Sequence, residues 1–268
     1  MPDIARKAAQ NLELLRRKKP LVHNITNLVV MNVTANALLA MGASPIMAHA
    51  QNEVEQVVSL ADALVLNIGT LSEQWMASML KAGSKASQLN IPVVLDPVGA
   101  GATTFRTSSA KKLVEKIDIR VIRGNPSEIL SLRYENSKTK GVDSFHTVSD
   151  AEETARLLAR ELKTTLAVTG PTDFVTDGIR TVRITNGHTL MGCITGSGCM
   201  ATAIIASFLS IDSCAVTAAS TALSFFGLAG EIAGNKANGP GTFMVGLFDA
   251  LYNITPGLLE KGAKIFEN

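Results

Sequence analysis

A glycine-rich run in the last third of the chain holds the residues best suited to chemistry. Residues 194–200 read Ile-Thr-Gly-Ser-Gly-Cys-Met, so Gly196 and Gly198 bracket Ser197, and Cys199 opens a long apolar, alanine-rich stretch. Glycine lets the backbone turn sharply and approach a ligand closely. The first turn of a helix presents unpaired N–H groups and the positive end of its dipole. The run therefore predicts a turn at a helix N-terminus that binds an anion or stabilises a thiolate.

The same run formally fits a dinucleotide-binding pattern, Gly-x-Gly-x-x-Ala, over residues 196–201. That pattern belongs after the first strand of a βαβ unit and is answered by an acidic residue about twenty residues later. Here the run lies late in the chain, and residues 216–221 contain no acid. The sequence therefore argues against a nicotinamide-dependent enzyme.

Two carboxylates follow predicted strands and could hold a cation. Asp96 comes directly after an apolar run, and Glu128 lies in Asn125-Pro-Ser-Glu128 after another. Asp-Pro often forms only a turn, and Asn125 with Glu128 also reads as a helix start. Carboxylates at neighbouring strand ends nevertheless suit a divalent cation that bridges phosphates. Arg123 would add a fixed positive charge, although a lone Arg at a strand end is more often a surface ion pair.

The elements that would position these residues alternate along the chain. Short β-branched or leucine-rich runs at 63–68, 92–98, 120–123 and 166–169 are separated by amphipathic segments near 51–60, 72–89, 107–118 and 150–163. This order predicts an α/β fold with a mainly parallel sheet flanked by helices. Residues 174–185 contain two short runs around Asp177-Gly178, which predicts an antiparallel hairpin at the sheet edge. No linker or repeat interrupts the pattern, so we expect one domain over residues 1–268.

Charge and composition argue against macromolecular partners. The net charge is only +2, and basic residues are not interleaved with aromatic ones, so we expect no nucleic-acid binding. The N-terminus lacks a secretory apolar region. The uncharged stretch 213–230 is long enough for a membrane but rich in small residues, which favours a buried helix. We therefore expect a cytoplasmic protein without a membrane segment.

The cysteines and histidines show no metal-ligand spacing. Three cysteines leave an odd count, which favours a reducing compartment. We interpret Cys193 and Cys214 as buried structural residues. The histidines at positions 23, 49, 146 and 188 are interpreted as solvent-facing or hydrogen-bonded.

Taken together, the motifs resemble those of the hydroxyethylthiazole kinase family, which belongs to the ribokinase-like superfamily. The resemblance rests on Gly196-Ser-Gly-Cys199, Asn125-x-x-Glu128, Asp96-Pro-Val-Gly99 and the segment 32–47, which ends in Gly-Ala-Ser-Pro-Ile-Met. It extends from about Val22 to Tyr252 with the motifs in the same order. The resemblance implies transfer of the ATP γ-phosphoryl group to the primary alcohol of 4-methyl-5-(2-hydroxyethyl)thiazole, a salvage step of thiamine biosynthesis. It also implies a homotrimer with the thiazole site between neighbouring subunits.

The resemblance also implies roles for particular residues. Met47 and Gly196 would contact the thiazole, although Met47 could equally be an ordinary core residue. The nucleotide would contact Arg123 and Thr169, while Asp96 and Glu128 would organise Mg²⁺. The N–H groups of the turn at Gly196, Ser197 and Gly198 would receive charge on the transferring group.

Cys199 departs from the wider superfamily, whose members have an aspartate as the base at this position. A helix N-terminus lowers the pKa of a thiol, and a nearby phosphate raises it, so the sequence leaves the net direction open. We expect Cys199 to position the hydroxyl and to act as a weak base. The alternative is a buried structural cysteine.

Three other functions compete on the same fold. A hydroxymethylpyrimidine kinase, or another vitamin-alcohol kinase, is disfavoured by segment 32–47 and Cys199. A nucleotide-dependent dehydratase should carry aspartate in place of Cys199. A non-catalytic thiazole- or nucleotide-binding protein could lose its metal carboxylates, whereas Asp96 and Glu128 are both present.

Overall fold

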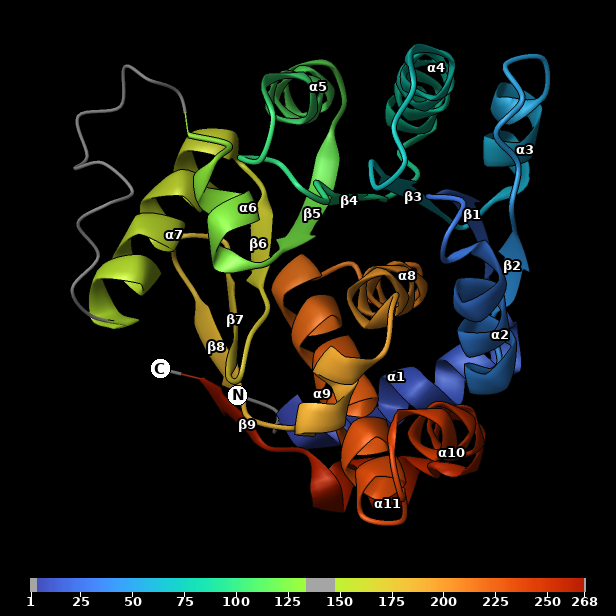
Figure 1. Cartoon of the computed structure of the whole chain (residues 1–268), viewed down its shortest axis with the longest axis vertical. Helices are drawn as coiled ribbons and strands as arrows, with labels where there is room; N and C mark the ends of the chain where they lie inside the picture. Colours follow the sequence, from blue (N-terminus) through green and yellow to red (C-terminus); the bar gives the residue numbers. More distant parts are fainter. Residues whose placement is uncertain (1–3, 134–147, 268) are drawn as a thin grey trace.

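A nine-stranded sheet runs through the part of the chain that the computed structural model describes, residues 4–133 and 148–267 (Figure 1). In order across the sheet the strands are β2 (Ser44–Ile46), β1 (Leu21–Ile25), β3 (Ala63–Asn67), β4 (Val93–Asp96), β5 (Ile119–Gly124), β6 (Thr165–Val168), β7 (Asp173–Thr176), β8 (Thr181–Ile184) and β9 (Ile265–Glu267). Neighbours from β2 to β6 are parallel, and β6 to β9 are antiparallel. The predicted α/β fold, parallel sheet and edge hairpin are therefore confirmed.

Helices cover both faces of the sheet (Figure 1). One face carries α3 (Val54–Leu60), α4 (Glu73–Leu89), α5 (Thr104–Lys116), α6 (Pro126–Leu130) and α7 (Val148–Leu162). The other carries α1 (Ile4–Lys18), α2 (Met31–Met41), α8 (Ser197–Leu209), α9 (Ala215–Gly234), α10 (Pro240–Asn253) and α11 (Pro256–Gly262). A short 3₁₀ helix, η2 (Thr189–Cys193), precedes α8.

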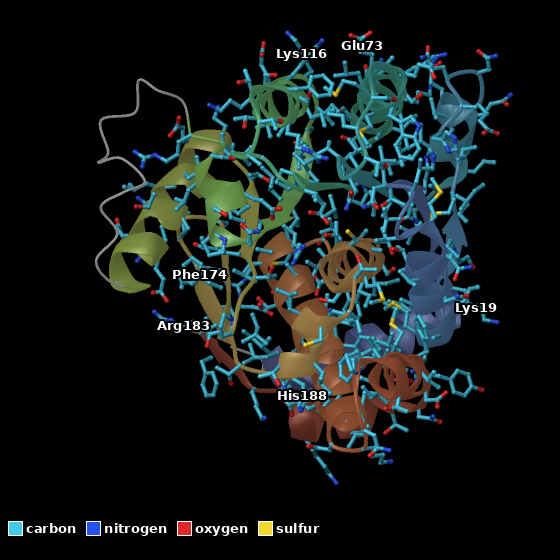
Figure 2. All side chains as sticks on the ribbon, viewed as in Figure 1. Lys19, Glu73, Lys116, Phe174, Arg183 and His188 are labelled. Carbon is cyan, nitrogen blue, oxygen red and sulfur yellow. The ribbon has the colours of Figure 1, made fainter. Side chains whose placement is uncertain are left out.

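The central strands are apolar because both of their faces are covered. All five residues of β3 are buried. Since side chains alternate along a strand, Ala63 and Val65 pack with α8 and its neighbours, whereas Leu64 and Leu66 pack under α3 to α5. Charged side chains such as Lys19, Glu73 and Lys116 lie at the periphery (Figure 2).

The uncharged stretch near residue 213 forms α9. Its length and apolar character would suffice to cross a membrane, and 83% of its most apolar window is buried within the fold. Two of its glycines allow close approach of the segment that follows β8, because a Cβ at Gly230 or Gly234 would collide with Met191 or His188. The expected buried helix is thus observed.

Two interpretations of cysteines were wrong. Cys193 and Cys214 are exposed free thiols and not buried residues. Cys193 ends η2, and Cys214 is the residue before α9, so both sit at the ends of elements that face solvent.

The described histidines are held by local contacts. His23 is fully buried with Nε2 2.7 Å from the Ala48 carbonyl oxygen. The ring of His49 lies 4.9 Å from that of Trp75, and His188 Nδ1 accepts from the Leu190 N–H. His146 lies outside the described residues.

Arg16 joins the C-terminal ends of two helices. Its guanidinium donates to the carbonyl oxygens of Met41 at 3.2 Å, of Leu251 at 3.0 Å and of Ile254 at 2.7 Å. The side chain crosses Gly42, whose φ of +102° closes α2. A cation at these carbonyl groups satisfies acceptors that a helix leaves unpaired.

We expect Arg16→Ala to lower the free energy of unfolding by about 2 kcal/mol, because it removes several charge-assisted hydrogen bonds at once. Urea unfolding followed by circular dichroism measures the change. Arg17→Ala, at the exposed neighbouring position, is the matched control and should change stability by less than about 0.5 kcal/mol. Equal effects of the two substitutions would contradict this role for Arg16.

Candidate active site

The carboxyl ends of the parallel strands bring the predicted polar residues together. Asn67 ends β3 and is paired in register with Asp96 at the end of β4. Arg123 lies near the end of β5, and Thr169 directly follows β6. The chain places β2 on one side of β1 and β3 on the other, so the strand order reverses between β1 and β3. Ligands of open α/β sheets bind at such a reversal.

The glycine turn closes this edge from the helical layer. Gly196 has φ +85° and directly precedes α8, so the predicted turn into a helix is observed. A Cβ at Gly196 would lie 2.9 Å from Val30 Cγ1, and one at Gly198 would collide with the Arg123 guanidinium. The absence of a side chain at Gly198 lets the N-terminus of α8 lie against Arg123, and its absence at Gly196 lets the turn lie against Val30.

Cys199 lies in the first turn of α8, where two side-chain amides hold its sulfur. Asn67 Nδ2 donates to Sγ at 3.2 Å, and Asn27 Nδ2 lies 3.5 Å from it. Burial and the nearby Asp96 carboxylate raise the pKa of the Cys199 thiol to about 11, against the opposing effect of Asn67 and Arg123. In the nucleotide-free protein Cys199 is therefore a neutral thiol near pH 7, because burial and Asp96 outweigh the groups that lower its pKa.

Asp96 is fully buried, and within the described residues only one of its two carboxylate oxygens accepts hydrogen bonds. Its Oδ2 accepts from Asn67 Nδ2 and from Thr202 Oγ1, each at 2.8 Å, whereas no group of the described residues donates to its Oδ1. Burial raises the pKa of Asp96, and Arg123, with Nη1 3.8 Å from Oδ2, opposes the rise. A buried, unpartnered carboxylate oxygen is costly unless a cation or donor joins it.

Glu128 lies in the first turn of α6, as predicted, and its charge acts on Asp96. Its Oε2 accepts from the Asn125 N–H in a capping box, and its Oε1 accepts from the Gly99 N–H, both at 2.9 Å. The Glu128 charge contributes to the raised pKa of Asp96, which places the two carboxylates within electrostatic reach. Residues 4–133 and 148–267 contain no group of three His, Cys, Asp or Glu that could hold a metal alone. Two carboxylates with a free oxygen fit Mg²⁺, which takes its other ligands from phosphates and water.

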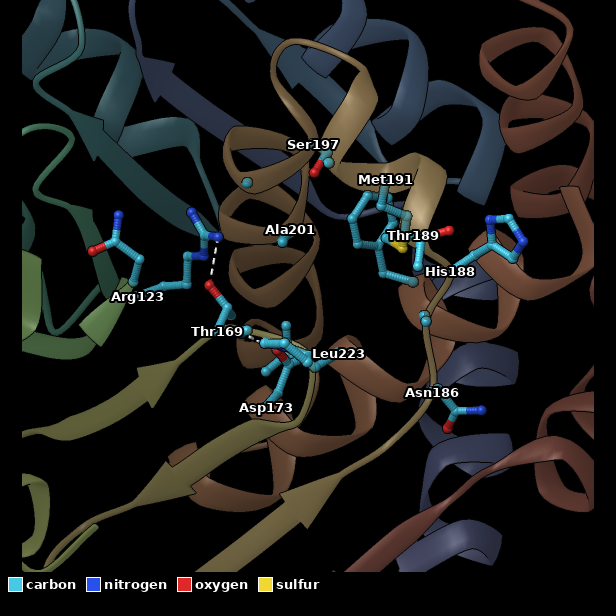
Figure 3. A pocket seen from close by; sticks show the side chains of 18 residues that line it. Arg123, Thr169, Asp173, Asn186, His188, Thr189, Met191, Ser197, Ala201 and Leu223 are labelled. Carbon is cyan, nitrogen blue, oxygen red and sulfur yellow. Dashed lines mark hydrogen bonds between the residues drawn. The ribbon is translucent and has the colours of Figure 1, made fainter. Parts of the chain in front are cut away.

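A cavity of about 500 Å³ opens beside these groups (Figure 3). Arg123 and Thr169 line one end, where Arg123 Nη2 donates to Thr169 Oγ1 at 2.6 Å. Ser197 and Gly198 also line it, and α9 provides an apolar wall that includes Leu223. Within residues 4–133 and 148–267 the buried Nε of Arg123 has no hydrogen-bond partner.

Two residues expected to contact the thiazole do not line this cavity. Met47 follows the edge strand β2, is partly buried and does not line the cavity. Gly196 also lies outside the cavity lining and faces Val30 and Val33 before and within α2. Neither residue therefore shares the cavity that Arg123 and Thr169 line.

Known proteins share this arrangement over the whole chain. The model of the hydroxyethylthiazole kinase family matches residues 12–257. The chain belongs to the hydroxyethylthiazole kinase family. A hydroxyethylthiazole kinase of Desulfotalea psychrophila is 60% identical over 100% of this chain and 98% of its own, and one of Thermoanaerobacter pseudethanolicus is 50% identical over 95% and 97%.

Solved structures agree with the family and the fold. The hydroxyethylthiazole kinase protein of Pyrococcus horikoshii has a TM-score of 0.90 and 45% identity, covering 98% of this chain and 99% of its own. A ribokinase-like superfamily protein of Enterococcus faecalis has a TM-score of 0.63 at 12% identity, covering 90% of this chain and 89% of its own. That second likeness supports the ribokinase-like fold alone. The kinase family implies ATP as the co-substrate.

Several residues at the candidate site were not identified from the sequence, because no motif marks them. Asn27 and Thr202 contact Cys199 and Asp96 but stand in runs without a recognisable motif. Arg106 donates from α5 to the carbonyl oxygens of Ile68 at 2.8 Å and Gly69 at 2.6 Å. An Arg within an amphipathic helix gives no hint that it ties the end of β3 to the site.

Asp173 is a further missed residue, on the wall of the cavity at the start of β7. Burial raises its pKa to about 6, against hydrogen bonding by the Gly170 N–H and attraction by Arg123. Between pH values of about 4 and 6 the folded chain therefore binds more protons here than the unfolded chain. The contribution of this carboxyl group to the free energy of unfolding falls as the pH rises through that window.

We expect Asp173→Asn to stabilise the nucleotide-free protein by on the order of 2 kcal/mol above pH 6, with the gain disappearing as the pH falls toward about 4. Thermal or urea unfolding at pH 4.5 and pH 7.5 measures the two differences. The exposed Asp118→Asn is the control and should show no such trend. A pH-independent difference for Asp173→Asn would contradict the raised pKa.

Proposed function

We propose that this chain uses ATP and Mg²⁺ to phosphorylate the primary alcohol of 4-methyl-5-(2-hydroxyethyl)thiazole, a salvage step of thiamine biosynthesis. Family membership supports the substrate and the reaction class. The observation that carries the site assignment is the unpartnered Oδ1 of the buried Asp96, next to Arg123 and the N-terminus of α8. Together these groups form a place for a cation and a phosphate chain.

The nucleotide would bind with its phosphates at the charged end of the cavity. Arg123 and Thr169 supply a guanidinium and a hydroxyl there, and the N–H groups at Ser197 and Gly198 point from the first turn of α8. A helix N-terminus and an arginine both favour phosphate oxygens. The adenine base would pack against the apolar wall that α9 provides.

Asp96 and Glu128 would hold Mg²⁺, which supplies neutralisation of charge on the phosphate oxygens when bound. Asp96 offers its free Oδ1, while Glu128 is oriented by the N–H groups of Asn125 and Gly99. Thr202 and Asn67 fix the other Asp96 oxygen, so the free oxygen has a defined direction.

The thiazole alcohol would meet the γ-phosphate at Cys199, with Gly196 and Met47 contacting the ring. The sulfur accepts from the Asn67 amide, and its proton remains on the thiol near neutral pH because of the raised pKa. Cys199 therefore positions the hydroxyl more than it removes the proton. In a loose transition state the oxygen–phosphorus bond to ADP breaks early, and the alcohol proton leaves late.

The assembly and its location follow from the family resemblance. We infer a homotrimer of single-domain subunits, each spanning residues 1–268, with the thiazole site completed by a neighbour. Leu28 and Val29, which follow Asn27, are 65% and 63% exposed and would be covered by such a neighbour. The three free cysteines favour the reducing cytoplasm. We infer no nucleic-acid or membrane partner.

We expect ADP release that depends on Mg²⁺ and on hydroxyethylthiazole, because both carboxylates and the alcohol site are needed for transfer. A coupled assay with ATP measures it, beside hydroxymethylpyrimidine and a blank without alcohol. Release with hydroxymethylpyrimidine alone would assign another vitamin-alcohol kinase. No release from folded protein would overturn the kinase proposal and favour a dehydratase or a binding protein.

We expect Cys199→Ala to lower kcat by less than about 100-fold, because a neutral thiol supplies less than full general-base catalysis. Cys199→Asp should preserve turnover, since Asn27 and Asn67 can donate to a carboxylate as well. Steady-state kinetics measures both, with Cys214→Ala as a control at an exposed thiol of α9. Complete loss of activity in Cys199→Asp would contradict the positioning role.

A further inference from the structure

Asp173 is an acidic group inside the cavity that the phosphate site does not explain. It begins β7, directly after the turn that follows Thr169, and it lines the cavity together with Arg123 (Figure 3). Its Oδ1 accepts from the Gly170 N–H at 3.0 Å. Within the described ranges no side chain or N–H group donates to its Oδ2. The carboxylate is thus oriented through one oxygen and leaves the other unpaired.

A carboxylate in this position works against an anionic ligand. Burial raises the pKa of Asp173 to about 6, so the group is charged at pH 7.5. A buried negative charge near a phosphate chain weakens binding unless the ligand itself brings a donor to it. The free Oδ2 of Asp173 therefore indicates that the ligand carries a hydrogen-bond donor at this point of the cavity.

The layout of the cavity limits which donor that is. Arg123, Ser197 and Gly198 mark the phosphate end, and Leu223 with Phe226 marks an apolar wall suited to a flat base. Figure 3 shows Asp173 just beyond Thr169 as seen from Arg123, on the side of the cavity where Leu223 lies. In a nucleotide, the group between phosphate and base is the ribose, which carries two hydroxyl donors.

We propose that Asp173 binds the ribose hydroxyls of the nucleotide and makes the enzyme prefer ribonucleotides to deoxyribonucleotides. The proposal rests on the assignment of this cavity to the nucleotide. The turn at Gly170 holds one carboxylate oxygen so that the other accepts from the sugar. Asp173 is then a specificity-determining residue that takes no part in phosphoryl transfer itself.

The test compares the binding of ADP, 2′-deoxyADP and 3′-deoxyADP by titration calorimetry at pH 7.5. Wild-type protein should bind ADP about tenfold or more tightly than at least one deoxy analogue, because a hydrogen bond to a charged group contributes on that scale. Asp173→Ala should bring the ratio close to one, because ADP loses a hydrogen bond and the deoxy analogues no longer meet an unpaired negative charge. Asp173→Asn should give an intermediate ratio, and Asp118→Asn, at an exposed acid, should retain the wild-type ratio.

Steady-state kinetics with ATP, 2′-deoxyATP and 3′-deoxyATP provides a second, independent test. In wild type the deoxy analogues should raise KM with little change in kcat, since the sugar is remote from the transferring group. Inosine triphosphate separates the ribose from the adenine amino group. If Asp173 accepted from that amino group, inosine triphosphate would be disfavoured in wild type and deoxyATP would not, and the ribose assignment would fall.

The outcomes distinguish this proposal from the assignment of the function. Equal affinities for ADP and both deoxy analogues in wild type would overturn the role of Asp173 while leaving the kinase intact. Unchanged ratios in a folded Asp173→Ala variant would do the same. No binding of any nucleotide by folded wild type would overturn both.

Discussion

The buried Asp96 carboxylate is the group on which the rest of the site depends. A charge taken fully out of water is costly, and the surrounding chain offsets this cost with Asn67, Thr202 and Arg123. These residues come from β3, α8 and β5, so the same carboxylate ties two strands to the helix that supplies the glycine turn. These hydrogen bonds and the ion pair reach only Oδ2, because Oδ1 of Asp96 has no partner in the described chain. The fold thus leaves one oxygen of this polar network free at the place where the proposed Mg²⁺ would bind.

The charge of Asp96 also explains why a neutral thiol suits position 199. The carboxylate is among the causes that raise the pKa of Cys199, so the thiol keeps its proton near neutral pH. Asn67 mediates between the two, because its Nδ2 donates both to Asp96 Oδ2 and to Cys199 Sγ. Its Oδ1 accepts from Asn27 Nδ2, so the amide orientation is set by one continuous chain of hydrogen bonds. Such a network orients the thiol without charging it.

The sequence predicted the parallel half of the fold well, because its signals are local. Apolar runs closed by Asn67, Asp96 and Arg123 identified both the strands and the edge at which they meet. The three-residue strands β2 and β9 gave no such signal, and β2 contains a proline. Cys214 was interpreted as buried from its residue type, whereas its exposure depends on its place at the start of α9.

The contacts that could not be predicted join residues far apart in the chain. Asn186 shows why: its side chain accepts from Ser224 Oγ and the Lys264 N–H, and donates to Glu231 and to the Gly262 carbonyl oxygen. No local pattern specifies four partners from α9 and the C-terminal segment. These bonds fix the start of the segment that closes the cavity opposite Arg123.

The parallel half of the sheet therefore supplies the charged groups, and the antiparallel half with α9 supplies the remaining walls. Asp173 is the partly buried first residue of β7, whose other three residues are buried, so it can line the cavity while the rest of the strand lies in the core. Asp96, at the end of a parallel strand, is fully buried and is held by Asn67, Thr202 and Arg123 through one of its two oxygens. The two kinds of strand pairing thus carry two kinds of carboxylate: Asp96, buried with one free oxygen, at the proposed metal and phosphate site, and Asp173, partly buried, at the proposed ribose site.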